Sequence, residues 1–254
     1  MDLSIITDGW PYDEENDAEN VRKVVGVDGK TKIQVRIPNG VVQWESEGRP
    51  DGQRPFGHAS VLTCCERRLS DGGDIDDALS PELVDELVLE LFDYYRRSQA
   101  LFHLADYDHT LADIVHALRI LKLLRLYAPH ESLQFDQYRP GLLVDRARAQ
   151  MLMEVRQGQL REAFDALNQG INDIEGFYLE HEMDDQIADS PERQILVELR
   201  RSLRERHNVP LNDQEILRSL RVEQEVAIRK ENYEMAARLR DKIASLKQRI
   251  GSQD

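Results

Sequence analysis

The sequence has 254 residues and only two cysteines, which are adjacent, Cys64 and Cys65. Adjacent cysteines cannot join distant segments, so their pattern indicates a reducing compartment, and we expect a cytoplasmic protein. No apolar run approaches the roughly 18 residues that indicate a membrane-spanning helix. The first 20 residues also lack the basic start and apolar stretch of a signal peptide. Aromatic residues make up 6%, so any core must consist mainly of aliphatic side chains.

Acidic residues are in excess, with 48 Asp and Glu against 33 Lys and Arg, so the formal net charge is −15. This balance argues against direct binding to nucleic acid or to an anionic membrane, since both favour cations. The nearest match to a phosphate-binding loop is "GVDGKT" at 26–31, which has two residues between its glycines where the loop has four. We interpret it as a hairpin turn. Zinc-type cysteine pairs and Ser/His/Asp constellations are also missing, so the sequence predicts no cofactor, no metal, no catalytic residue and no enzymatic activity.

Three weaker site hypotheses stay open. His103, His109 and His116 lie among aspartates and invite a metal interpretation, but the pattern favours surface or packing histidines. The two cysteines precede "ERR", and nearby cations lower a thiol pKa, so a redox sensor is the alternative to a small apolar pair.

The loop "EGRPDGQRPFGH" at 47–58 carries Arg49, Asp51 and Arg54. Its arginines either bind an acidic partner or, as we favour, bind the chain's own acidic surface. An unrecognised enzyme site in this loop is a further alternative.

Residues 21–46 predict a three-stranded meander. The dipeptides Asp-Gly at 28–29 and Asn-Gly at 39–40 are strong hairpin signals. Between them Ile33, Val35 and Ile37 alternate with polar residues, so one face is expected to be apolar and the other polar. So small a sheet needs a helix or a partner over its apolar face.

Long helices are expected from Pro81 onward, with Ser80 as the N-cap of the first. Residues 100–121 and 149–171 each run from an apolar helix through a polar turn into a helix with small residues at core spacing. This arrangement resembles tetratricopeptide-type helix pairs, although the polar turns of the two units lie about 53 residues apart where that repeat has a period of 34. A generic antiparallel helical bundle is the alternative.

The C-terminal segment has a regular apolar pattern. Residues 236, 239, 243, 246 and 250 step by three and four, which is typical of a coiled-coil-like seam. A second, poorer pattern at 216–228 precedes it, so we expect two antiparallel helices joined by a short turn. A hairpin of about 35 residues buries too little surface to be stable alone, so it needs a partner surface.

The string "YE-x-AA-x-LRD-x-I-x-x-L" at 233–246 resembles the UVR domain. That resemblance implies a non-catalytic hairpin for protein–protein contact, found in the excision-repair proteins UvrB and UvrC and in Clp-type proteases and their adaptors. Together with Leu220 of the poorer upstream pattern, the resemblance gives a set of expected partner-binding residues: Ala227, Tyr233, Ala236, Ala237, Leu239, Arg240, Asp241, Ile243 and Leu246.

The sequence therefore predicts a mainly α protein with a small N-terminal β-meander (α+β). We expect a flexible acidic leader at 1–20, the β module with a short helix at 21–69, a linker at 70–80, a helical domain at 81–208 and the UVR-like hairpin at 209–254.

The expected function is that of an interaction or scaffold protein, which forms a homodimer or docks a UvrB/UvrC-like or Clp-system protein without contacting nucleic acid or membrane directly. An accessory factor of nucleotide excision repair and a stress-response Clp protease adaptor are the alternatives.

Overall fold

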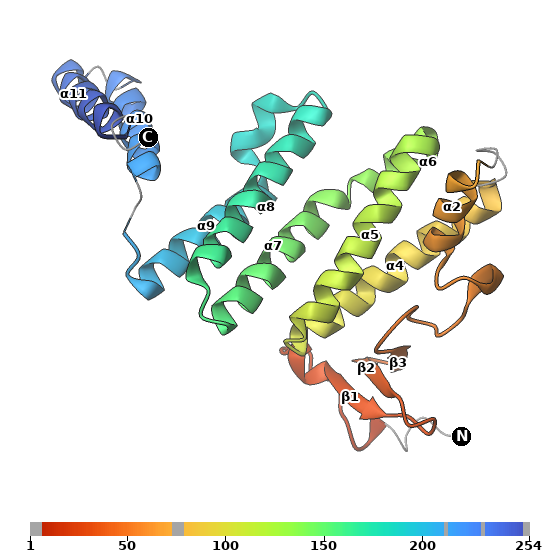
Figure 1. Cartoon of the computed structure of the whole chain (residues 1–254). Helices are drawn as coiled ribbons and strands as arrows, with labels where there is room; N and C mark the ends of the chain where they lie inside the picture. Colours follow the sequence, from red (N-terminus) through yellow and green to blue (C-terminus); the bar gives the residue numbers. More distant parts are fainter. Residues whose placement is uncertain (1–6, 73–78, 211–212, 230–231, 251–254) are drawn as a thin grey trace. The chain divides into compact units, whose positions relative to one another are not determined.

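A computed structural model describes residues 7–72, 79–210, 213–229 and 232–250. The predicted linker at 70–80 falls largely outside these residues. By its internal contacts the chain divides into two compact units, residues 1–200 and 201–254, which are described separately. The fold is mainly α with a small N-terminal antiparallel sheet, as the sequence predicts (Figure 1).

The sheet has the order β1-β2-β3, with strands Val21–Val25, Thr31–Ile37 and Gly40–Glu45. Val35 stands opposite Val21 on one side and Val42 on the other. In the first turn Gly29 has φ +74°, a conformation that glycine adopts without a steric penalty. The two predicted hairpins are thus confirmed.

The polar face of the sheet is less exposed than the alternation predicts. Lys32 is 6% exposed and is paired with Asp28 and Glu45. Arg36 is 8% exposed and donates from Nε to the carbonyl of Trp10 at 2.9 Å and from Nη1 to that of Gly40 at 2.9 Å. Long cationic side chains can therefore be buried here, because each folds back onto carboxylates or backbone carbonyls.

The first unit continues with helices that follow one another closely. A 3-10 turn, η1 (Asp17–Asn20), precedes the sheet, and η2 (Pro55–Gly57) follows it. The helices are α2 (Val61–Ser70), α4 (Pro81–His103), α5 (Tyr107–Tyr127), α6 (Pro129–Asp136), α7 (Arg139–Arg156), α8 (Leu160–Glu180), the 3-10 turn η3 (Asp184–Asp189) and α9 (Pro191–His207), whose residues after Arg200 are counted with the second unit. Helix α5 ends just before Pro129 as predicted, but that proline starts the short helix α6, which the sequence pattern did not indicate.

One aliphatic core joins α2, α4, α5 and the start of α7. Leu62, Leu87, Ile114 and Leu124 are fully buried in it. A smaller cluster joins the sheet to the end of α4, where Ile33 meets Ala100 and Leu101. Figure 1 shows α4, α5, α7 and α8 as successive layers with the sheet beside the end of α4. The β module and the long helices therefore belong to one compact unit.

Gly170 marks the closest approach between α7 and α8. A Cβ added there would stand 2.5 Å from the Cβ of Ala147 and 2.8 Å from Cδ1 of Leu196 on α9. Only a residue without a side chain fits between these three helices. The tetratricopeptide-type resemblance stays a prediction, and Gly170 stands at a position where that repeat usually has alanine.

Candidate protein-interaction site

The second unit contains the predicted hairpin, formed by α10 (Asp213–Arg229) and α11 (Tyr233–Ile250). Asn232 joins the two helices at the turn. Its side-chain oxygen accepts a hydrogen bond from the N–H of Met235 at 3.1 Å, and its own N–H donates to the carbonyl of Ala227 at 2.8 Å. Asn232 is therefore the N-cap of α11, and its N–H also pairs with a carbonyl in the last turn of α10. These two hydrogen bonds allow a short polar turn to reverse the chain.

The inner face of the hairpin is made of the residues of the predicted seam. Ala227, Ala236 and Leu239 are 7%, 7% and 4% exposed and form one cluster, against which Leu220 packs. Ile243 and Leu246, further along α11, are also buried, whereas the side chain of Ile250 lies outside those described. The apolar seam therefore serves the folding of this unit and is not a free surface.

The remaining predicted partner-binding residues point outward. Tyr233 is 68% exposed, and Ala237, Arg240 and Asp241 are exposed as well. Arg240 Nε lies 3.0 Å from Asp241 Oδ1, but both side chains are about 70% in solvent, so the pair adds little to stability.

Two exposed apolar residues near the turn were missed. Ile228 and Met235 are 49% and 45% exposed. Each directly adjoins a buried alanine, Ala227 or Ala236, so a helical projection that places those alanines inside would have placed both neighbours outside.

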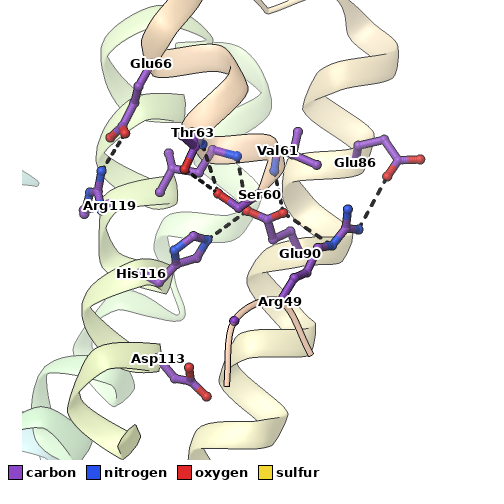
Figure 2. A network of polar contacts seen from close by, with 12 residues as sticks. Arg49, Ser60, Val61, Thr63, Glu66, Glu86, Glu90, Asp113, His116 and Arg119 are labelled. Carbon is purple, nitrogen blue, oxygen red and sulfur yellow. Dashed lines mark hydrogen bonds and ion pairs between the residues drawn. The ribbon is translucent and has the colours of Figure 1, made fainter. Parts of the chain in front are cut away.

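In the first unit, the predicted arginine loop joins a buried polar network around Glu90 of α4 (Figure 2). Glu90 is fully buried and accepts hydrogen bonds from the N–H groups of Val61 at 2.7 Å and Leu62 at 3.2 Å, and from Nε2 of His116 at 2.8 Å. Arg49 lies 3.6 Å away through its Nε. The carboxylate thus caps the N-terminus of α2 and ties it to α4, α5 and the loop.

This network settles how Arg49 is used. Besides Glu90 it approaches Asp51 at 3.3 Å and Glu86 at 4.0 Å, so Arg49 binds the chain's own acidic side chains. The sequence analysis favoured this for both Arg49 and Arg54, and these contacts confirm it for Arg49. Burial by itself raises the pKa of Glu90, but the hydrogen bonds from His116 and from the N–H groups of Val61 and Leu62 outweigh it and hold that pKa below its usual value.

The cysteines are buried on α2, and both are free thiols. Burial raises the pKa of Cys65 to about 11, with further contributions from the neighbouring Cys64 and from Glu90, while Arg68 opposes the shift. For Cys65 this is the opposite of the lowered thiol pKa that a redox sensor requires, so the small apolar pair is the better description.

Of the three predicted histidines, His109 and His116 are held by structural contacts, whereas His103 is exposed at the end of α4. His116 stacks on Tyr94 with ring centroids 3.8 Å apart, and His109 lies 2.8 Å from Asp106. Among the described residues, no group of three or more His, Cys, Asp or Glu side chains could hold a metal ion. None of the helices in the described part of the chain has the length and apolar character to cross a membrane.

Comparison with known families agrees with the geometry of the hairpin. Residues 214–249 match the family model described as UVR, the UvrB/uvrC motif. No curated protein and no solved structure matches the chain. The match covers 36 of the 254 residues and coincides with α10 and α11. The C-terminal hairpin is therefore a UVR motif, a motif associated with protein interaction and DNA repair, as the sequence resemblance predicted.

Proposed function

We propose that this chain is a non-catalytic interaction protein that docks a second copy of itself, or another UVR-bearing protein, through the turn end of its C-terminal hairpin. The observation that carries the proposal is the exposure of three large apolar side chains, Ile228, Tyr233 and Met235, within eight residues of sequence around the turn. They remain in solvent although the inner face of the same hairpin is closed by apolar contacts.

Exposed apolar groups at this place need an explanation. A hairpin this small has few apolar side chains to spare for its surface, so a partner that covers the turn end would bury apolar area that the hairpin itself leaves in water. Tyrosine and methionine are both enriched at the centres of protein interfaces. Arg240 and Asp241 lie further along α11 and could form the polar rim of such an interface, where exposed charges affect specificity more than affinity.

A second candidate is an accessory factor of nucleotide excision repair. It is favoured by the UvrB/uvrC motif, and the net charge of −15 favours reaching DNA through a partner protein over direct binding. This candidate predicts association with DNA in the presence of a UvrB- or UvrC-type protein and none by the chain alone at physiological salt.

The first experiment is light scattering of the full chain across a concentration series, followed by binding to purified UvrB-, UvrC- and Clp-type proteins. The test variant is Tyr233→Ser with Met235→Ser, because these exposed side chains leave the inner face intact. A matched control is Lys247→Ser, an exposed position toward the other end of α11. We expect the double variant to lose association while its helix content stays unchanged, and the control to behave as the wild type. Equal association of all three proteins, or no association with any partner, would contradict the proposal.

A further inference from the structure

The two edge strands of the sheet, β1 and β3, differ in how their outer edges are protected. On β1, the N–H of Val21 donates to the carbonyl of Ala18 in η1, and Lys23 places a charge on the strand, paired with Asp106 at 2.5 Å. Charged side chains and covering elements keep edge strands from pairing with another chain. Residues 40–44 of β3, "GVVQW", contain no charged residue, so this edge lacks the charge that protects β1.

Hydrogen bonds at the end of β3 show which of its backbone groups face away from β2. The N–H of Ser46 donates to the carbonyl of Thr31 at the start of β2 at 3.2 Å. The N–H of Glu45 instead donates to the carbonyl of Pro50, in the loop that follows β3, at 2.9 Å. Neighbouring residues of a strand direct their backbone groups to opposite edges. Every second residue of β3 before Glu45 therefore faces outward as well.

The outward residues before Glu45 are Val41 and Gln43. Within the described part of the chain, their backbone N–H and C=O groups form no hydrogen bond. A strand added at this edge would pair these groups, which are otherwise left to water. Because Pro50 already occupies the N–H of Glu45, the free length of the edge ends at residue 44, and an added strand has only these two residues to bind.

A second copy of β3 fits this edge in one antiparallel register. If both outward residues take part, Val41 of each copy stands opposite Gln43 of the other, because the two copies are related by a two-fold axis. Val42 then faces its own equivalent as a cross-strand apolar pair. Trp44 faces Gly40 of the second copy, where an added Cβ meets nothing within 4 Å, and an aromatic side chain opposite an edge glycine is a stabilising pair.

The charge of the chain also favours a second copy at this place. Each copy carries a net charge of −15, so two copies repel each other over most of their surfaces. Residues 40–44 bring no charge to the contact, and in the register described no two like charges stand opposite each other. The segment is therefore complementary to itself, whereas it offers no charge by which a differently charged partner would be selected.

We propose that the outer edge of β3 pairs with the same edge of a second copy of the chain. The two sheets then form one continuous antiparallel sheet with the order β1-β2-β3-β3-β2-β1, in which Val41 lies opposite Gln43 across the interface. This contact belongs to the first unit. It goes beyond the function proposed for the hairpin and does not depend on it.

The test uses the full chain with Tyr233→Ser and Met235→Ser, so that association through the turn end of the hairpin does not contribute. Light scattering of this protein is measured across a concentration series up to about 1 mM, at which even a weak dimer is populated. We expect the mass to rise toward twice that of one chain.

Two matched variants in the same background test the register. Val41→Glu with Gln43→Glu places like charges opposite each other in both cross-strand pairs, whereas Val41→Glu with Gln43→Lys places opposite charges there. The two variants share the change at 41 and differ only at 43. We expect the first to associate at least about tenfold more weakly than its parent, and the second to associate at least as tightly.

Amide hydrogen exchange requires no change in the strand and so stays informative if a charged variant disturbs the sheet. We expect the N–H groups of Val41 and Gln43 to become protected over the concentration range in which the mass rises. The N–H of Val25, which faces outward on β1 as that of Val21 does, should stay unprotected.

Three results would overturn the proposal. The first is a protein that stays monomeric throughout the series. The second is a mass that rises without protection of Val41 and Gln43, or protection that is already complete in the monomer. The third is an equal effect of the two charged variants on association.

Discussion

Replacing Glu90 by glutamine should destabilise the first unit by about 3 kcal/mol. One carboxylate oxygen accepts from the N–H of Val61, and the other accepts from the N–H of Leu62 and from His116. Glutamine has a single acceptor oxygen, so its NH₂ group must face one of these donors. A buried donor left without a partner costs about 1–3 kcal/mol, and loss of the charge at the helix N-terminus adds up to about 2 kcal/mol.

The assay is urea unfolding of the full chain followed by circular dichroism at neutral pH. Glu86→Gln provides a matched control, because Glu86 lies one turn earlier on α4, is 49% exposed at its side chain and stands 4.0 Å from Arg49. An exposed pair of this kind contributes less than about 1 kcal/mol. If Glu90→Gln costs no more than Glu86→Gln, the carboxylate does not hold α2, and the reasoning is refuted.

The same pair of proteins gives a prediction on pH. The pKa of Glu90 is lower in the folded protein than in the unfolded chain, where it is about 4.3. The stability that its charge contributes is therefore present above that value and is lost as the pH falls through the folded pKa. The stability difference between wild type and Glu90→Gln should be largest near neutral pH and should narrow below about pH 4. A difference that grows in acid would contradict this sign.

Three further predictions concern other parts of the chain. In thermal unfolding, Gly170→Ala should destabilise the protein by about 1–3 kcal/mol, because the added Cβ clashes with Ala147. The control is Gly176→Ala on the same helix, where an added Cβ meets nothing within 4 Å, and this variant should be neutral or stabilising. Because the pKa of Cys65 is about 11, only about one molecule in ten thousand carries the thiolate at pH 7, so a disulfide reagent should label Cys65 only when urea unfolds α2. Rapid labelling of the native protein would contradict the burial of this thiol. Leu239→Ala should lower the free energy of unfolding of the hairpin by about 2–5 kcal/mol and reduce its helix content. An unchanged circular dichroism spectrum would show that the interior of the hairpin does not depend on this side chain.

Local patterns in the sequence were sufficient for the elements with a clear period or turn chemistry. Asp28 and Gly29 specify a turn whose conformation glycine accepts, and the alternation after it specifies a strand. The spacing of Ala236, Leu239 and Ile243 specifies one face of a helix, and the string around it is specific enough to predict the UVR motif. These features depend on residues a few positions apart, so they can be predicted from the sequence without knowledge of the fold.

What the apolar seam contacts was decided by tertiary structure. The apolar pattern in α11 was compatible with packing against a partner protein, against a second copy of the chain or against the preceding helix. The fold assigns Leu239 to the inside of the hairpin and leaves Tyr233 and Met235 in solvent. Periodicity identifies an apolar face, but the surface that covers it depends on how α10 returns along α11.

Tertiary structure alone also produced the polar network and the open edge of β3. Glu90 meets Val61 across 29 positions of sequence and His116 across 26. Nothing in the composition of α4 distinguishes this buried acid from the exposed Glu86. The sequence by itself determined helices, strands, turns and the UVR motif, because these follow from local spacing. Which charges are buried, and which edge of the sheet is left open, follows from the way separate elements pack together, and so only the folded chain could decide it.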